Sequence, residues 1–196
     1  YAAGGIHNLV ITNLAATGPL FGSDPDRPAF FSDEWWTLLD EVCDDAAELG
    51  VSLWFYDQIG FSGADIPARL VEEHPAYAGQ WLLPDGSVET GGFDYLSPEA
   101  CAALLDRVHG EFERRRGHRL GTVVVGSFQD ELPAMPTWSP TFAAEFARRR
   151  GYELAPVLPA LWDVDDPSGE AVRRDYHLTR AELAEEAFFR PHAEWH

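Results

Sequence analysis

Val51-Ser-Leu-Trp-Phe-Tyr-Asp57 is the stretch of sequence that decides the fold class. It is apolar nearly throughout, which is typical of a strand covered on both faces. Two similar stretches, Ile6 to Thr12 and Thr122 to Phe128, predict strands of the same kind. Amphipathic helical patterns follow each of them. This alternation predicts an α/β protein with parallel strands.

The helices are predicted from their caps and their apolar spacing. In the first, Ser32 is the N-cap and Gly50 ends the helix. Its apolar residues recur at helical spacing: Trp35, Leu38, Leu39, Val42, Ala46 and Leu49. Three further helices are expected: from Ser97-Pro98 to Arg116, from Ser139-Pro140 to about Arg150, and from about Ser168 to His196.

A long connection, Gln58 to Leu96, follows the second strand. It is predicted to hold a short helix near Pro67 to Glu73 and a hairpin around Pro84-Asp85-Gly86. Connections of this length after a strand are usually functional.

Three strands alternating with helices predict a partial (β/α)8 TIM barrel. A closed barrel of this type takes about 250 residues, whereas this chain has 196. Three strands also leave two unpaired sheet edges, which natural proteins seldom expose. We therefore expect residues 1–196 to form a single domain that is a fragment of a barrel. The remaining strands would come from a missing part of the chain or from another subunit.

The charge of the chain limits its partners. There are 14 Lys and Arg residues against 33 Asp and Glu residues, so the formal net charge is −19. Such a chain repels nucleic-acid phosphates and anionic membranes, and no apolar run approaches the roughly 20 residues of a membrane span.

Cys43 and Cys101 are expected to be buried free thiols, with a disulfide as the alternative. Neither reading fixes the compartment, and secretion stays open.

Carboxylates end two of the three predicted strands. In parallel α/β proteins the functional site lies at the carboxyl ends of the strands. Those ends carry Asn13, then Tyr56 and Asp57, and then Asp130 and Glu131. The site is therefore predicted at this edge of the sheet.

Glycoside hydrolysis uses two carboxyl groups, one of which donates a proton to the leaving oxygen. The acid must keep its proton near neutral pH, through burial or a neighbouring negative charge. We predict Glu131 as this general acid and Asp130 as its support or as a hydrogen-bond partner of the sugar. Both can face the site only if the strand has already ended before them, because adjacent strand residues point to opposite faces. The alternative is that the pair caps the next loop or helix.

The substrate would be held by polar groups beside aromatic rings. We predict this role for Asp57, Tyr56, Asn13, Trp81 and Trp138. For Asp57 the alternative is a loop turn, and for each tryptophan it is packing. His192 and His196 have the helical i, i+4 spacing of metal ligands but lack the His-Glu-x-x-His order of zinc peptidases. No metal site is predicted.

Several motifs, taken in order, resemble α-L-rhamnosidases of glycoside hydrolase family 106 and related barrel hydrolases. Leu53-Trp-Phe-Tyr-Asp57 with Phe61-Ser-Gly63 and Glu73-His-Pro-Ala-Tyr77 is similar to their "WxYDE…PSG…hPey" block. Further matches are Asp94-Tyr-Leu-Ser-Pro98, Ser127-Phe-Gln-Asp-Glu131, and Phe146 to Leu161 with Gly151-Tyr152. The similarity extends from about Ile6 to Trp195.

The resemblance implies a (β/α)8 barrel that hydrolyses a terminal sugar, with Glu131 on the family's acidic strand end and Asp57 as its substrate-facing aspartate. The second catalytic carboxylate would lie on a later strand, outside this chain. Some family members use calcium, but no ligand set matches here, so no cofactor is predicted. Gln58 replaces the usual Glu, and Phe61 the usual Pro. Two alternatives stay open: an inactive carbohydrate-binding relative, and a structural or non-carbohydrate hydrolase domain.

Overall fold

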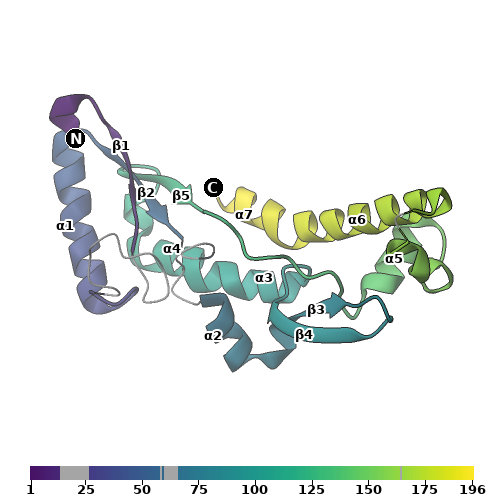
Figure 1. Cartoon of the computed structure of the whole chain (residues 1–196). Coiled ribbons are helices and arrows are strands. Elements are labelled where there is room, and N and C mark those ends of the chain that lie inside the picture. The colour runs from purple at the N-terminus through teal and green to yellow at the C-terminus, as the bar shows by residue number, and fades with distance from the viewer. Residues whose placement is uncertain (14–26, 58, 60–65, 164) are drawn as a thin grey trace. The chain divides into compact units, whose positions relative to one another are not determined.

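A computed structural model of the chain describes residues 1–13, 27–57, 59, 66–163 and 165–196 (Figure 1). The chain forms two compact units, and each is described by itself. The first, here called the sheet unit, comprises Tyr1–Ile66 and Leu105–Pro133. The second, the helical unit, comprises Pro67–Leu104 and Ala134–His196. Gln58 and Phe61-Ser-Gly63, which belong to the rhamnosidase-like block of the sequence, lie outside the described residues.

The sheet unit is built on three parallel strands in the order β1-β2-β5. The strands are β1 (Asn8–Ile11), β2 (Ser52–Tyr56) and β5 (Val124–Phe128). All three were predicted, and the mixed α/β class is confirmed. The described residues form this open sheet and not a closed barrel. β5 begins later than predicted because a turn precedes it, in which Gly121 has a φ of 70° and the Thr122 hydroxyl donates to the Arg119 carbonyl.

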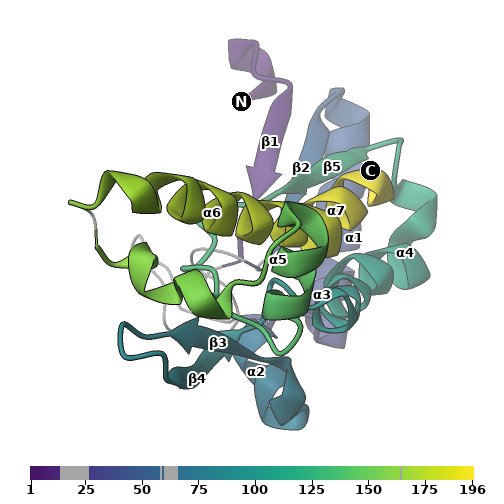
Figure 2. The same ribbon diagram turned by 90° about the vertical axis from the view of Figure 1, so that its right-hand side faces the viewer.

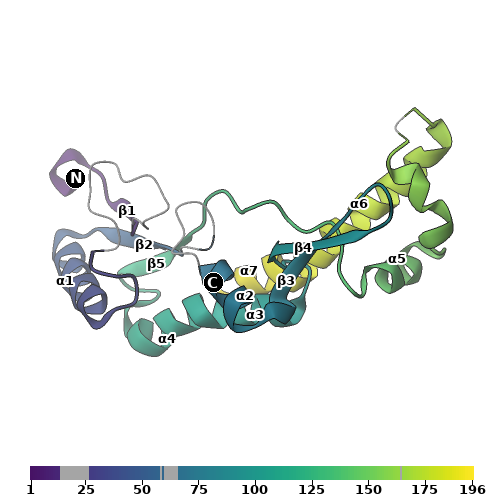
Figure 3. The ribbon, with the colours of Figure 1, turned by 60° about the horizontal axis from the view of Figure 1, so that its bottom comes forward.

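Two helices cover one face of this sheet, as Figure 3 shows. They are α1 (Asp33–Leu49) and α4 (Glu111–Arg116), which follows the π-helical turn η3 (Asp106–Gly110). Two short 3-10 turns, η1 (Ala2–Gly4) and η4 (Gly117–Arg119), also belong to the described part of this unit. The predicted caps of α1 are confirmed. The Ser32 hydroxyl accepts from the Trp35 amide, and Gly50 ends the helix with a φ of 64°.

An aromatic core joins the helices to β2. The Phe55 ring stacks on Phe112 with centroids 3.8 Å apart, and Phe112 meets Trp36 edge to face at 5.1 Å. The predicted stripe of α1 is partly wrong, because Leu38 and Leu49 are exposed. The residues that α1 buries are spaced by three and four positions from the second tryptophan onwards: Trp35, Trp36, Leu39, Cys43 and Ala46.

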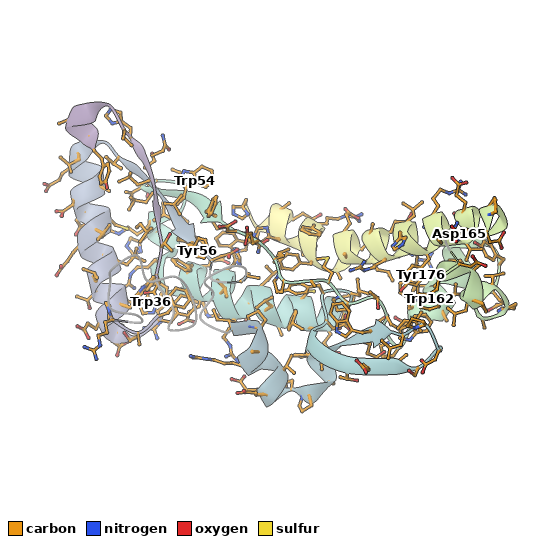
Figure 4. The ribbon with its side chains drawn as sticks, viewed as in Figure 1. Trp36, Trp54, Tyr56, Trp162, Asp165 and Tyr176 are labelled. Carbon is orange, nitrogen blue, oxygen red and sulfur yellow. The ribbon has the colours of Figure 1, made fainter. Side chains whose placement is uncertain are left out.

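The opposite face of the sheet carries Trp54 and Tyr56, which alternate along β2 with the core residues Leu53 and Phe55. Figure 4 shows both side chains extending from β2. Trp54 is 37% exposed and lies over Gly126. This face is therefore only partly covered by the described residues. Neither outer edge of the sheet pairs with a further strand in that part of the chain.

The helical unit begins with α2 (Ile66–Glu73), whose first residue belongs to the sheet unit, and the turn η2 (Pro75–Tyr77). An antiparallel hairpin of β3 (Ala78–Leu82) and β4 (Val88–Phe93) follows, as predicted. Helix α3 (Pro98–Leu105) comes next.

A buried aspartate organises the start of α3. The Asp94 carboxyl accepts from the Leu96 amide at 2.9 Å, and the Ser97 hydroxyl then accepts from the Ala100 amide at 3.2 Å. Burial raises the pKa of the Asp94 carboxyl. The cap predicted at Ser97-Pro98 is confirmed.

The rest of the helical unit is a group of helices around one core. Figure 2 shows α5 and α6 side by side. The elements are α5 (Phe142–Arg150), η5 (Ala155–Leu161), η6 (Pro167–Gly169), α6 (Glu170–Ala184), η7 (Glu185–Phe189) and α7 (Arg190–Trp195). Their core includes Leu82, Leu96, Phe142, Phe146, Leu154, Tyr176 and Leu183.

Two smaller predictions concern the start of α5 and the two cysteines. Helix α5 begins at Phe142, later than predicted, because Ser139 and Pro140 lie in a turn closed by the Phe142 amide on the Ser139 carbonyl. Cys43 and Cys101 are buried free thiols, as expected. None of the helices in the described part of the chain is long and apolar enough to cross a membrane.

Candidate functional site

The carboxyl ends of β2 and β5 lie next to each other in the sheet unit. Tyr56 is paired with Phe128, and the Asp57 amide donates to the Phe128 carbonyl at 3.0 Å. Because the strands are parallel, the residues that follow them emerge at the same edge of the sheet. The structure therefore brings together the ends that carry Asp57 and Asp130-Glu131.

Asp57 is fully buried, with 0% of its surface exposed. Its Oδ1 atom accepts from the Ile59 amide at 3.0 Å, and its Oδ2 atom accepts from Nε2 of Gln129 at 3.1 Å. A buried carboxyl is tolerated where hydrogen bonds replace water in this way. In the structure Asp57 joins two strand ends and begins a turn. Its contact with substrate stays a prediction.

The pKa of Tyr56 reflects burial and negative charge at this edge of the sheet. Burial, followed by the nearby negative charges of Asp130, Asp57 and Glu131, raises the pKa of the Tyr56 phenol to about 12. The phenol keeps its proton at neutral pH and is a hydrogen-bond donor in that state. All three acidic side chains are close enough to this ring to affect its titration.

The chain leaves the strand conformation before it reaches the acidic pair. Strand β5 ends at Phe128, so the alternation of a strand does not dictate where Asp130 and Glu131 point. Glu131 is exposed and Asp130 is half-buried. Glu131 also has a φ of 34°, which is uncommon for a residue with a side chain. Backbone strain of this kind is concentrated at functional sites.

Asn13 follows the end of β1, and its side chain contacts α1. Its Oδ1 atom accepts from the indole nitrogen of Trp35 at 3.2 Å. The bond fixes the start of α1 relative to the first strand. Asn13 thus has an observed structural contact, and its predicted contact with substrate stays a prediction.

Trp81 and Trp138 belong to the helical unit, where both are half-buried. The Trp81 indole donates to the Gly91 carbonyl at 3.0 Å, across the hairpin. Trp138 stacks on Phe142 with ring centroids 5.1 Å apart. These contacts agree with the packing alternative for both tryptophans, and a role in sugar binding stays a prediction.

Two residues at the strand ends escaped the sequence-based prediction. Phe128 is 42% exposed, and its ring centroid lies 5.8 Å from that of Tyr56. Gln129 is the hydrogen-bond partner of Asp57. The sequence offered a reason to select Phe128, because it is an aromatic residue at a strand end directly before the acidic pair. The sequence offered no such reason for Gln129, because its partner Asp57 lies 72 positions earlier.

Two of the pockets lie away from the strand-end carboxyl groups. One, of about 380 Å³, lies in the helical unit between η5 and α6 and is lined mainly by Pro156, Val157, Pro159 and Val172, with Asp163 and Asp166. The other, of about 330 Å³, lies on the outer side of α1, around Leu38.

The histidine pair of the C-terminal helix is confirmed as a helical neighbour pair. Nδ1 of His196 bonds to the His192 carbonyl at 3.0 Å, and the two rings meet edge to face at 5.1 Å. That bond occupies one nitrogen of the His196 ring.

Comparison with known proteins assigns no family. No protein-family model matches the sequence, and no curated protein matches it. A catalytic mutant of a GH42 beta-galactosidase from G. stearothermophilus is a distant structural neighbour, at 15% sequence identity and a TM-score of 0.46. The match covers 80% of this chain and 22% of the enzyme. The chain thus spans about a fifth of that protein, and a likeness this distant does not define its activity.

Proposed function

We propose that this chain carries part of the active site of a glycoside hydrolase, on a partial (β/α)8 barrel. Glu131 is the general acid and Asp130 supports it. The second catalytic carboxylate lies outside these 196 residues, on a strand supplied by a further part of the protein or by another subunit. The substrate is a terminal sugar, and an α-L-rhamnoside is the first candidate because of the sequence motifs.

The observation that carries the proposal is the meeting of acidic and aromatic side chains at two adjacent parallel strand ends. Asp130 and Glu131 follow β5, and both influence the titration of Tyr56 at the end of β2. The exposed Phe128 ring lies beside Tyr56. Sugars bind through stacking of C–H faces on rings and through hydroxyl bonds to carboxylates.

In this arrangement each of these residues has a separate role. Glu131, which is exposed, delivers the proton to the leaving oxygen. Tyr56 keeps its phenolic proton and donates a hydrogen bond. Asp57, which is buried, acts through the residues it holds, and Phe128 offers a ring face to the sugar.

The test is hydrolysis of unsubstituted phenyl glycosides, including a phenyl α-L-rhamnoside and a phenyl β-galactoside, by the protein at its full natural length. Replacing Glu131 by Gln should lower kcat by about 10²- to 10⁴-fold, the usual worth of general acid–base catalysis. Glu113→Gln, an exposed glutamate on α4, is the matched control and should leave the rate unchanged. An active protein in which Glu131→Gln keeps the full rate would refute the assignment.

A second candidate is saccharide binding without turnover. Gln58 favours it, because an amide stands there in place of the carboxylate that the rhamnosidase-like block usually has. Calorimetric binding of a saccharide, weakened by Phe128→Ala and accompanied by no hydrolysis, would support this candidate. Neither binding nor hydrolysis across a broad glycan panel would refute both.

A further inference from the structure

The link between Gln129 and Asp57 is the last side-chain contact described between β2 and β5 before the acidic pair. The backbone contributes one bond there, from the Asp57 amide to the Phe128 carbonyl. The Gln129 amide contributes the next, at 3.1 Å to Oδ2 of Asp57. The two bonds hold the chain at Phe128 and at Gln129, the two residues directly before Asp130.

Of the two partners, Asp57 is the anchor. It is fully buried, directly follows β2, and also holds the Ile59 amide at 3.0 Å. Gln129 is half-buried and lies where the chain has already left the strand. An amide suits this place because it can donate to a carboxyl without bringing a charge. A glutamate of the same length can donate only while it is protonated.

Glu131 has a backbone conformation that neighbouring contacts have to maintain. A φ of 34° in a residue with a side chain costs on the order of 1–3 kcal/mol and persists only where neighbouring contacts impose it. Gln129 lies two residues before Glu131.

We propose that Gln129 is a positioning residue, whose amide joins the ends of β2 and β5 through Asp57 and so fixes the backbone from which Asp130 and Glu131 project. Its effect on catalysis rests on the proposed glycosidase function. The link itself does not, and it can be tested without activity.

The test with activity uses Gln129→Glu. Two carboxyl groups at this distance cannot both be ionised. The variant should therefore keep the link in acid, where the pair holds a proton, and lose it as that proton dissociates. Asp57 affects the titration of Tyr56, and Asp130 and Glu131 affect the titration of the same phenol. We expect kcat relative to wild type to fall by about 10- to 100-fold as the pH rises, a loss typical of a displaced catalytic group. KM should change little.

Exchanging the two groups should rescue the variant. In Asp57→Asn combined with Gln129→Glu, the introduced amide can donate to the introduced carboxylate and still accept from the Ile59 amide. We expect the double variant to recover most of kcat and to lose the added pH dependence. Gln80→Glu makes the same chemical change in β3 and is the control. A wild-type-to-variant ratio that is constant with pH, or a double variant no better than Gln129→Glu alone, would overturn the proposal.

The test without activity uses the phenol of Tyr56. Gln129→Leu removes the donor without adding a charge, so Asp130 and Glu131 should loosen. The part of the raised Tyr56 pKa that these two charges cause should then be lost, while the larger part, which is due to burial, remains. The pKa of Tyr56 is measured by ultraviolet titration, as the difference from the same protein carrying Tyr56→Phe, with circular dichroism to verify folding. A folded Gln129→Leu variant with an unchanged Tyr56 pKa would refute the link, whether or not the protein hydrolyses glycosides.

Discussion

The substitution Gly126→Ala should make the added methyl group clash with the ring of Trp54. A Cβ atom there would lie 2.6 Å from Cζ3 and 2.8 Å from Cε3 of that ring, whereas ordinary contacts begin at 3.4 Å. The ring is rigid, so it or the strand must move by nearly 1 Å. Overpacking of this kind costs about 1–3 kcal/mol. Replacing glycine by alanine also stiffens the unfolded chain, which stabilises the fold by about 0.4–1 kcal/mol.

A double-mutant cycle separates the two effects. In Trp54→Ala the obstructing ring is gone, so Gly126→Ala should be neutral or stabilising there, and the coupling between the two sites should be about 1–3 kcal/mol. The free energies are measured by urea unfolding followed by circular dichroism. Gly117→Ala is the control, since a Cβ at Gly117 meets nothing within 4 Å. A coupling below about 0.5 kcal/mol, the usual scatter of additive sites, would refute the packing of Trp54 on β5.

Three further outcomes follow from the structure. Because the pKa of Tyr56 is raised, the protonated phenol stabilises the folded state fully below pH 10, and this stabilisation is lost as the pH rises to about 12. The unfolding free energies of wild type and Tyr56→Phe, measured with urea, should therefore diverge across that window, and parallel curves of free energy against pH would contradict the raised pKa. Because the pKa of Asp94 is raised, the stabilisation that its protonated carboxyl contributes falls as the pH rises through that pKa. Asp94→Asn keeps an acceptor for the Leu96 amide and should therefore make the unfolding free energy depend less on pH in acid. An unchanged slope of unfolding free energy against pH would contradict the raised pKa. Phe112→Ala should lower the unfolding free energy by about 3–5 kcal/mol, whereas exposed Leu38→Ala should cost far less, and similar losses would contradict the core described for α1.

The local elements were predictable because their signals are local. Ser32 and Gly50 delimit α1 through bonds to residues within four positions. The strands were recognisable from continuous apolar runs. The predicted stripe of α1 failed at Leu38 and Leu49, because a list of apolar residues does not say which part of the helix surface the sheet will cover.

The candidate site was predictable only in outline. The rule that parallel strands end at one edge correctly brought together Asp57 and the pair after β5. The burial of Asp57 and its bond to Gln129 depend on pairing between segments 72 residues apart, which no local pattern encodes. The positive φ of Glu131 was equally hidden, because glutamate gives no signal for that conformation.

The most direct test of the site is the dependence of hydrolysis on the leaving group. A general acid matters most when the departing oxygen is strongly basic and little when it leaves unaided. Rates should therefore be compared for wild type and Glu131→Gln on a series of aryl glycosides, from dinitrophenyl to unsubstituted phenyl. We predict a loss that is small for the dinitrophenyl glycoside and grows by orders of magnitude towards phenyl. An equal loss across the series would contradict proton donation by Glu131.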